Sequence, residues 1–402
     1  MRFVTDLSKG ILGAPDSSEF WEEIVSQIPD DVFLKNDVKI LCPAVGHGTE
    51  ADIIVRRMRS LGRSVEDIQS RIYLIDKYRV FTKALQRRGY TNVICADFMT
   101  WETDMKFDVV VGNPPYQDPN NDKKMLWNSF MDKSLEVAKD NAIIAMVTPA
   151  TWIRAKTNIH NSYKLFEEYQ VERAVVYAKD DTPFPGVGST ISYHITKKIA
   201  RATSTPIYYG EWSKKREQFI RNVDLKNDKT WPGELTPTNL AIHDKLTPFT
   251  KIKFVKSCEF HNQKLKSKKM VSDIQSEEFP YTHHVSAAIT RYTNAKFSNY
   301  ADWKVMVPLT STIDKAVVDN DCGHGEDMLT LYVDNQKTAN NIKHLFQTEV
   351  YKFIGKMYKN GRNQVLQNIF PLVDFSKKWT NEELYDLFGF TAEEREYARN
   401  YN

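Results

Sequence analysis

The sequence predicts an α/β protein with a doubly wound, mostly parallel sheet, followed by a second domain of the α+β class. Short apolar runs alternate with segments of helical periodicity up to about residue 200. The run at 141–147 is almost wholly apolar, as expected of a parallel strand that is buried on both faces. The alternation then stops. We therefore expect two domains, residues 1–200 and 201–402, each long enough to bury its own core.

Helices are expected where apolar residues recur every three or four positions, and strands where short apolar runs end at glycine, proline or an acid. The predicted helices of the first domain cover residues 17–28, 50–61, 80–88 and 125–138. The predicted strands cover residues 38–42, 71–76, 92–97, 107–111, 141–147, 171–177 and 190–196. In the second domain we expect helices to return only after Asn335.

Composition narrows the class of protein only moderately. The chain has 41% hydrophobic and 27% charged residues and a net charge of +3, which is ordinary for a globular protein and too small to indicate a nucleic-acid partner. The longest apolar run is far shorter than the ~20 residues that a membrane helix needs, so we expect a cytoplasmic protein without membrane contact.

Cysteine spacing argues against a disulfide framework or a metal site. The four cysteines lie far apart and form no C-x-x-C pair: Cys42, Cys95, Cys258 and Cys322. The zinc ligands that one could assemble in the second half are Cys258, His261, His283 and His284. Their spacing matches no usual zinc pattern, so we expect no metal.

Three successive strand ends carry residues suited to a nucleoside-containing ligand. A turn with Gly46 and Gly48 follows the first strand, Asp76 ends the second, and Asp97 with Phe98 ends the third. Glycines let backbone approach a ligand at a helix N-terminus, and strand-end acids accept hydrogen bonds from ribose hydroxyls or an adenine amine. Each feature alone is also common in ordinary turns, but ligands of open α/β sheets bind at these strand ends.

The most specific motif is the apolar strand 107–111 that leads into Gly112-Asn113-Pro114-Pro115-Tyr116. Two prolines fix the backbone and supply no N–H donors, which leaves the Pro114 carbonyl as an oriented acceptor. The Asn113 amide oxygen and this carbonyl can hold the two hydrogens of an aromatic amine, so that its lone pair points at an electrophile. Tyr116 would stack on the ring. A purely structural Pro-Pro turn is the alternative.

With these motifs the sequence resembles the amino-methyltransferases of bacterial and phage DNA, in the gamma arrangement where the cofactor motif precedes Asn-Pro-Pro-Tyr and a target-recognition domain follows. The resemblance extends over LWNSFMDKSLEVAKDNAIIAMVTPATWI, DTPFPGVGSTISYHITKK and the ending FPLVDFSKKWTNEELYDLFGFTAEEREYARNY. It implies a Rossmann-like sheet of the S-adenosylmethionine-dependent methyltransferase type and methyl transfer to the N6 amine of an adenine flipped out of duplex DNA. It also implies a bacterial cell or a phage-infected host.

The resemblance assigns roles to individual residues. Those expected to bind S-adenosylmethionine are Pro43, Ala44, Gly46, Gly48, Asp76, Lys77, Asp97, Phe98 and Asn113. Those expected to hold the target base are Asn113, Pro114, Pro115, Tyr116 and Phe184, with Phe184 against its other face or edge. One departure matters, because the family usually has an acid where Cys42 stands, near the methionine ammonium. His47 is a milder departure, and we expect it to be buried and uninvolved.

The second domain offers a candidate DNA-binding strip in residues 251–270, where seven lysines stand against one acid. The expected DNA contacts are Lys251, Lys253, Lys256, Lys264, Lys266, Lys268, Lys269 and Arg291. A solvated surface loop is the alternative.

Two other functions compete with DNA adenine methylation. Asn-Pro-Pro-Tyr can hold any planar carboxamide or aromatic NH2 group, so a protein glutamine-N5 methyltransferase is one alternative, although the second domain is larger than a peptide substrate requires. The other, motivated by Cys42, is a DNA-binding protein that has lost catalysis. The sequence does not reveal the recognition site, the number of strands methylated, the oligomeric state or the biological role.

Overall fold

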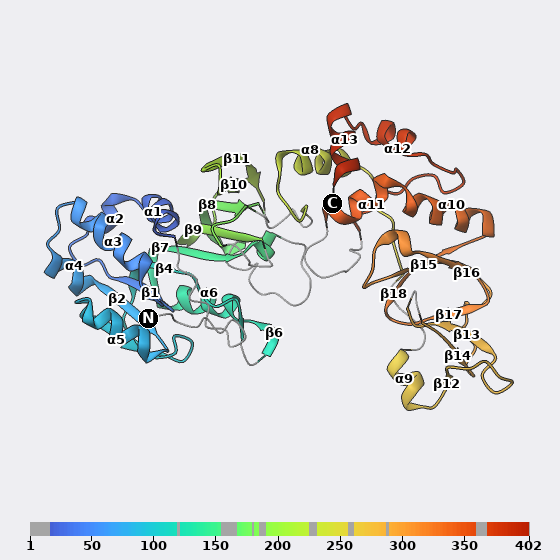
Figure 1. Cartoon of the computed structure of the whole chain (residues 1–402), viewed down its shortest axis with the longest axis horizontal. Coiled ribbons are helices and arrows are strands. Elements are labelled where there is room, and N and C mark those ends of the chain that lie inside the picture. The colour runs from blue at the N-terminus through green and yellow to red at the C-terminus, as the bar shows by residue number, and fades with distance from the viewer. Residues whose placement is uncertain are drawn as a thin grey trace. The chain divides into compact units, whose positions relative to one another are not determined.

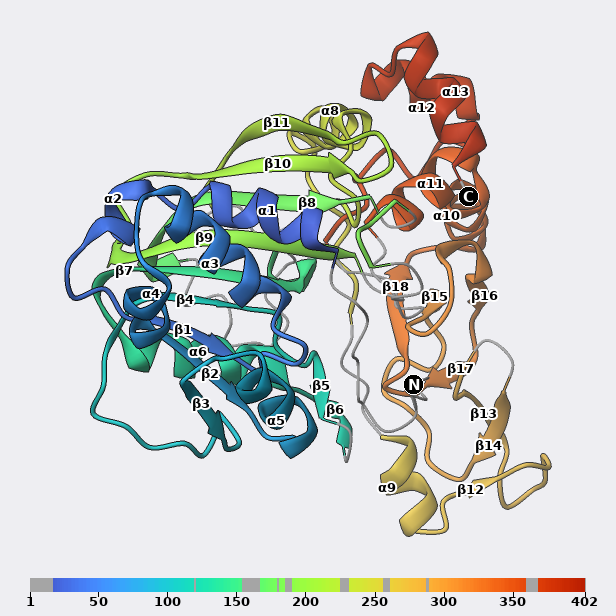
Figure 2. The same cartoon turned by 60° about the vertical axis from the view of Figure 1, so that its left-hand side comes forward.

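The chain forms two compact units, residues 1–230 and 231–402. The structure is a computed structural model, which is drawn in Figures 1 and 2. The residues that it describes are 17–118, 121–153, 167–178, 181–184, 190–224, 231–255, 261–286, 289–358 and 368–401.

A nine-stranded sheet organises the first unit. Its strands are β1 (Ile40–Pro43), β2 (Ile72–Asp76), β3 (Asn92–Cys95), β4 (Phe107–Gly112), β7 (Ala138–Pro149), β8 (Tyr169–Tyr177), β9 (Ile191–Ala200), β10 (Thr205–Glu211) and β11 (Arg216–Val223). The spatial order is β11-β10-β8-β9-β7-β4-β1-β2-β3. Strands β3, β2, β1, β4 and β7 are mutually parallel, whereas β9 runs antiparallel to both β7 and β8. The predicted doubly wound, mostly parallel sheet is therefore present.

The division between the units differs from the predicted one. The predicted boundary at residue 200 falls between β9 and β10, inside the nine-stranded sheet. Strand β10 pairs parallel with β8, and β11 pairs antiparallel with β10. The sequence of these two strands and the turn between them is rich in charged residues, so their membership of the first sheet depends on pairing that local periodicity does not reveal.

Helices cover both faces of this sheet. They are α1 (Ser18–Ser26), α2 (Asp30–Leu34), α3 (Thr49–Ser60), α4 (Val65–Arg71), α5 (Arg79–Arg87) and α6 (Leu126–Val137). Helices α1, α3 and α5 share one apolar core with alternate residues of the strands, for example Ile40, Val109 and Ala145. The chain moves in the opposite direction from β4 to β7, so a right-handed crossover places α6 on the other face. The predicted helices and strands of this unit agree with the observed ones to within a few residues.

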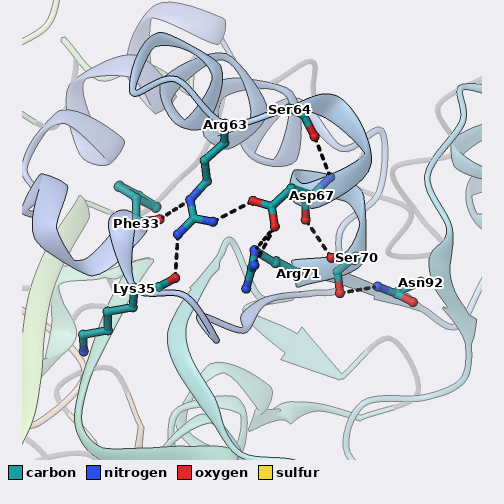
Figure 3. A network of polar contacts seen from close by, with 8 residues as sticks. All are labelled: Phe33, Lys35, Arg63, Ser64, Asp67, Ser70, Arg71 and Asn92. Atoms are coloured by element: carbon teal, nitrogen blue, oxygen red, sulfur yellow. Dashed lines mark hydrogen bonds and ion pairs between the residues drawn. The ribbon is translucent and has the colours of Figure 1, made fainter.

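A polar network joins the end of α2 to α4 beside the sheet (Figure 3). The Arg63 guanidinium donates to the carbonyls of Phe33 (2.7 Å) and Lys35 (2.5 Å) and to the carboxylate of Asp67 (2.6 Å). Arg71 donates to the same carboxylate. The hydrogen bond from Arg71, and next the one from Arg63, lower the pKa of Asp67 to about 2. The Asp67 carboxylate therefore stays charged and connects these segments at any ordinary pH.

The second unit contains two small sheets and a bundle of helices. One sheet has the order β16-β15-β18 and the other β12-β14-β13-β17. The strands are β12 (Val271–Ser272), β13 (Tyr281–His284), β14 (Thr290–Thr293), β15 (Trp303–Pro308), β16 (Val317–Asp319), β17 (Cys322–His324) and β18 (Met328–Val333). The helices are α8 (Pro237–Leu246), α9 (Asn262–Ser267), α10 (Gln336–Gln347), α11 (Glu349–Met357), α12 (Asn381–Phe388) and α13 (Ala392–Asn400). The first sheet shares its core with α8, α10, α11, α12 and α13.

The expectation that helices return only after Asn335 was wrong. Helix α8 begins behind the Thr236 cap, whose hydroxyl accepts from the Asn239 N–H, with Pro237 in its first turn. Helix α9 lies within the lysine-rich segment, where a single buried apolar residue, Leu265, gives too little periodicity to predict a helix. Among the described helices, none is long and apolar enough to cross a membrane.

A partly buried carboxyl pair in the first unit makes its stability depend on pH. Glu23 of α1 accepts a hydrogen bond from the Tyr177 hydroxyl (2.9 Å), and Glu217 of β11 accepts one from Tyr193 (3.1 Å) and forms an ion pair with Arg173. Burial, and then the hydrogen bond and charge of Glu217, raise the pKa of Glu23 from 4.5 to about 8. Folding therefore favours the protonated form of Glu23.

We predict that Glu23→Gln removes part of this pH dependence. The unfolded chain loses the Glu23 proton near pH 4.5 but the folded chain only near pH 8, so the free energy of unfolding falls as pH rises through that window. The variant should gain stability relative to the parent across the window, measured by urea unfolding. Glu22→Gln, at an exposed neighbour on α1, should show no such trend. A parallel pH profile for the parent and Glu23→Gln would contradict the assignment.

Candidate functional site

The strand order reverses between β1 and β4, and this reversal positions the candidate site. From β1 the chain proceeds through α3 to β2 and through α5 to β3, and then returns to β4 on the other side of β1. In open α/β sheets such a reversal leaves a crevice at the carboxyl ends of the two strands, where ligands bind. The loops that follow β1 and β4 carry the glycine turn and Asn-Pro-Pro-Tyr.

The two loops begin in direct contact. A methyl group added to Gly112, the last residue of β4, would lie 3.0 Å from the carbonyl oxygen of Pro43, the last residue of β1. A residue with a side chain would require the two strand ends to shift by a few tenths of an ångström, so glycine fits this approach best. The predicted cofactor motif and the predicted target motif therefore start side by side, although about 70 residues separate them in the sequence.

The turn after β1 is held in an unusual backbone conformation. Ala44, Gly46 and Gly48 all have positive φ, of 53°, 52° and 79°. A side chain at Gly48 would collide with Leu85 of α5, at 2.6 Å, whereas one at Gly46 would meet no atom within 4 Å. Gly48 thus seats the turn on the core, and Gly46 borders open space that a ligand could fill.

Asp76 at the end of β2 fixes this turn. Its carboxylate accepts the N–H of Gly46 (2.9 Å) through one oxygen and the N–H of Tyr78 (2.8 Å) through the other. Burial raises its pKa, and the two backbone donors oppose that effect. A carboxylate oxygen accepts more than one hydrogen bond, so Asp76 retains acceptor capacity for ribose hydroxyls. Lys77 beside it is exposed.

The remaining cofactor residues differ in accessibility. Asp97 is exposed, and its carboxylate accepts the N–H of Met99 (2.9 Å). Phe98 is buried, with its ring 5.4 Å from that of Phe130 on α6. Because the Phe98 ring already packs in the core, it could meet an adenine face only through its edge. The role of Phe98 in cofactor binding stays a prediction.

The residues expected to hold the target base lie at the end of β4. Asn113 and Pro115 are half-buried and Pro114 is buried. Tyr116 packs partly against the core, and its carbonyl accepts the N–H of Leu126, which starts α6 (3.1 Å). That hydrogen bond anchors the far end of the loop.

Phe184 occupies a different environment from the one expected. Its ring is 6% exposed and lies edge-on against Phe20 of α1, with the ring centroids 5.2 Å apart. The residues after it, 185–189, are outside the described residues. Its contact with a flipped base stays a prediction that this packing does not support.

Comparison with known proteins gives a consistent picture of this unit. Residues 52–184 match the family model of the Eco57I restriction-modification methylase. The type II methyltransferase M.CvrRI of Paramecium bursaria Chlorella virus XZ-6E is 37% identical over 84 residues, which cover 18% of this chain and 22% of that protein. The type II methyltransferase M.BstVI of Geobacillus stearothermophilus is 22% identical over 245 residues, which cover 48% of this chain and 43% of that protein. An uncharacterized adenine-specific methylase of Mycoplasma pneumoniae is 38% identical over 61 residues, 14% of each chain.

The first unit resembles restriction-modification methylases. The chain spans less than half the length of these curated relatives. Two solved structures share the fold of this chain over most of its length. One is the type IIL restriction-modification enzyme MmeI in complex with DNA, with a TM-score of 0.51 and 10% identity over 96% of this chain and 72% of that one. The other is a nuclease-deletion mutant of the type ISP restriction-modification enzyme LlaGI in complex with a DNA substrate mimic, with a TM-score of 0.51 and 12% identity over 90% of this chain and 46% of that one. The predicted Rossmann-like α/β fold is confirmed.

The departures from the restriction-modification methylase pattern lie around the turn. Cys42 is fully buried, and burial, followed by the charge of Glu50, raises the pKa of its thiol well above the ordinary value, so it is neutral. His47 is exposed, which corrects the expectation that it is buried, and its ring packs edge-on against Phe81. The His47 carbonyl accepts a hydrogen bond from the Arg88 guanidinium (2.7 Å). Arg88 also forms an ion pair with Asp52 of α3, so it links the turn to this helix.

The sequence interpretation missed Glu50. It follows Gly48 by two residues, lies in the first turn of α3 and is 2% exposed. Its charge acts on Cys42, so it lies near the position where the sequence resemblance implies an acid. An acid in a helix first turn is common on surfaces, and only the fold shows that this one is buried.

The predicted DNA-binding lysines of the second unit separate into two groups. Lys264, Lys266, Lys268 and Lys269 are exposed on or just after α9. Lys251 is half-buried and donates to the carbonyl of Leu246, and burial lowers its pKa to about 8. Lys253 is exposed, and Lys256 lies outside the described residues.

Arg291 is the remaining predicted DNA contact. Its guanidinium pairs with Asp273 (2.7 Å) on the sheet next to α9. Among the described residues of the predicted strip, the four exposed lysines on or just after α9 are therefore best placed to contact phosphate.

We predict that Gly48→Ala destabilises the first unit more than Gly46→Ala. Both substitutions force a residue with a side chain into the left-handed region, at a cost of about 1 kcal/mol. Only Gly48→Ala also drives a methyl group into Leu85, which adds roughly 1–3 kcal/mol of overpacking. Urea unfolding of the two variants measures the difference. Equal losses would show that the turn does not rest on α5 through Gly48.

Proposed function

We propose that this protein is an S-adenosylmethionine-dependent methyltransferase that methylates the N6 amine of adenine in duplex DNA. The observation that carries the proposal is the close approach of Gly112, the last residue of β4, to the carbonyl of Pro43, the last residue of β1, at the strand-order reversal. It brings a candidate nucleoside site and a candidate amine clamp to adjacent strand ends. The match of residues 52–184 to a restriction-modification methylase family supports the same reaction.

The residues around the turn suit S-adenosylmethionine. Gly46 borders space that an added Cβ would enter without contact, and the Asp76 carboxylate lies directly beside it. Asp76 would accept ribose hydroxyls, Asp97 the adenine amine, and backbone N–H groups at the start of α3 would face the methionine part. When bound, the cofactor supplies a methyl group on a sulfonium, whose positive charge makes that carbon electrophilic.

Asn113 and Pro114 would prepare the amine for attack. The lone pair of an adenine amine is delocalised into the ring, which makes it a poor nucleophile. Two fixed acceptors, the Asn113 amide oxygen and the Pro114 carbonyl, would hold both hydrogens and direct the lone pair out of the ring plane. The amine held in this way would be oriented to accept the methyl group that the bound cofactor would supply, and its extra proton would leave to solvent.

Duplex DNA as the substrate is supported by the second unit. A base inside a duplex is out of reach, so the target adenine must be flipped out, and the enzyme needs a surface to grip the remaining DNA. The α9 lysines offer exposed positive charge for phosphate contacts. One relative is named an adenine-specific methylase, and two proteins that share the fold were solved with DNA or a DNA mimic.

We predict that Asn113→Ala lowers methyl transfer by about a hundredfold or more, the usual effect of removing one fixed polar group from a transition state. The assay is transfer from labelled S-adenosylmethionine to mixed-sequence duplex DNA, followed by identification of the modified base. Asn340→Ala, at an exposed position on α10, should retain activity.

N6-methyladenine from the parent and Asn340→Ala, with a large loss in Asn113→Ala, would establish both the reaction and the clamp. Labelling of a glutamine side chain in a protein substrate, with none in DNA, would favour a protein glutamine-N5 methyltransferase. Binding to DNA without transfer to either substrate would favour a DNA-binding protein that has lost catalysis.

We further predict that Glu50 replaces the missing acid at position 42 in holding the methionine ammonium. Glu50→Gln should weaken S-adenosylmethionine binding by about tenfold or more, in line with the loss of one charge-assisted hydrogen bond. The double variant Cys42→Asp/Glu50→Gln should recover part of that affinity, because it returns the carboxylate to the usual position. Calorimetric titration measures both.

Glu66→Gln is the matched control, since Glu66 is an exposed acid in the first turn of α4. It should bind the cofactor as the parent does. Unchanged binding in Glu50→Gln would show that Glu50 has no part in the cofactor site.

A further inference from the structure

Three side chains with metal-binding atoms meet in the second unit. His284 ends β13, Asp319 ends β16 and Cys322 starts β17. One ligand atom from each lies within 4.8 Å of the others. The His284 Nε2 atom is 2.8 Å from the nearer carboxylate oxygen of Asp319. Strand pairing brings them together, because Thr282 lies opposite Cys322 and the side chain of His284, two residues on, points to the same face.

We propose that His284, Asp319 and Cys322 bind a divalent transition-metal ion of the Zn²⁺ class, with water as the fourth ligand. Imidazole nitrogen, carboxylate oxygen and thiolate sulfur are the three donor types that Zn²⁺ takes from proteins. Around a tetrahedral Zn²⁺ such atoms lie about 3.4–3.8 Å apart, as bond lengths of about 2.0–2.3 Å require. The observed cluster needs side-chain shifts of at most about an ångström to reach that geometry.

The surroundings orient two of the ligands as a metal site requires. The other ring nitrogen of His284, Nδ1, lies 3.3 Å from the Thr290 hydroxyl, which leaves Nε2 directed at the cluster. The second carboxylate oxygen of Asp319 accepts the N–H of Asn320 (2.9 Å). Hydrogen-bonded partners of this kind fix the rotamer of a ligand and commonly affect metal affinity by about 10–100-fold.

Cys322 supplies a buried sulfur in a mostly apolar shell. It is 0% exposed and packs with Met306 and Met328. Burial raises the pKa of its thiol to about 12, whereas the nearby Lys304 ammonium acts in the opposite direction. Binding of the metal would replace the thiol proton, which leaves to solvent, and the ion would then provide the positive charge that the thiolate needs.

A metal at this position would connect the two small sheets. Asp319 belongs to the sheet β16-β15-β18, whereas His284 and Cys322 belong to the sheet β12-β14-β13-β17. The second of these sheets lies beside α9, since Leu265 of α9 packs with Phe297 and with Tyr281 of β13. The ion would therefore fix the sheet next to the α9 lysines on the remainder of the unit.

The proposal departs from the expectation of no metal, which rested on spacing around other residues. His283 faces the opposite side of β13, where its ring stacks on Phe297 at 5.2 Å. His261 is exposed beside Glu326, and Cys258 lies outside the described residues. Asp319 and Cys322 lie 35 or more residues after His284, a separation that no compact zinc pattern contains.

The test is titration of the full, metal-stripped and reduced chain with Co²⁺, an ion that adopts Zn²⁺ geometry and reports sulfur ligation through a thiolate-to-metal charge-transfer band. We expect one Co²⁺ per chain, a charge-transfer band, and release of Co²⁺ by added Zn²⁺. Cys322→Ser should abolish the band, and His284→Gln should weaken Co²⁺ binding by at least about tenfold. Methyl transfer is not part of this readout, so the test is independent of the proposed function.

The controls separate this site from other thiols and histidines. Cys95→Ser, at an exposed cysteine of the first unit, and His261→Gln, at an exposed histidine, should bind Co²⁺ as the parent does. If Cys322→Ser fails to fold, Asp319→Asn tests the site instead, because Asp319 is partly exposed. Added Zn²⁺ should raise the melting temperature of Asp319→Asn less than that of the parent. Absence of the band in the parent, or a band that survives Cys322→Ser and disappears in Cys258→Ser, would overturn the proposal.

Discussion

The close approach of Gly112 to the Pro43 carbonyl is the constraint on which the candidate site depends. It brings the ends of β1 and β4 together where the strand order reverses, so that the loops after them begin in contact. A side chain at position 112 would require these strand ends to shift by a few tenths of an ångström. The reaction proposed here needs an electrophilic carbon and an amine within near-attack distance, and this backbone packing would bring the two loops that are expected to hold them together.

Most of the first unit follows from local patterns. The run 142–147 is apolar throughout, as expected of a parallel strand that is covered on both faces. Gly46 and Gly48 mark a turn with positive φ, a conformation that glycine adopts more readily than other residues. The burial of Glu50 and Phe184 could not be predicted in this way. Both depend on which elements pack against α1 and α3, and an acid or an aromatic ring after a turn has the same sequence appearance whether it faces a ligand or the core.

The second unit was harder to predict for a related reason. Its strands are short, and several of their pairings join segments far apart in the sequence, such as β13 with β17. Short strands carry too few residues for alternation to be recognised, and long-range pairing leaves no local signal. The lysine-rich segment shows the same limit, because one buried residue, Leu265, decides that it forms a helix and that its lysines point outward.

Charge placement distinguishes the two ends of the proposed cofactor site. At the ribose end Asp76 is fixed by two backbone N–H donors, so its carboxylate is already oriented before a ligand binds. At the methionine end the neutral Cys42 thiol cannot balance an ammonium, and the nearest described acid that acts on it is Glu50, on the following helix rather than on the strand. Both Glu50 and Cys42 are buried, so an acid on the helix turn would present its charge to an ammonium from a neighbouring element and not from the strand end. The proposed exchange of a strand-end acid for Glu50 thus depends on β1 and α3 being successive elements joined by one short turn.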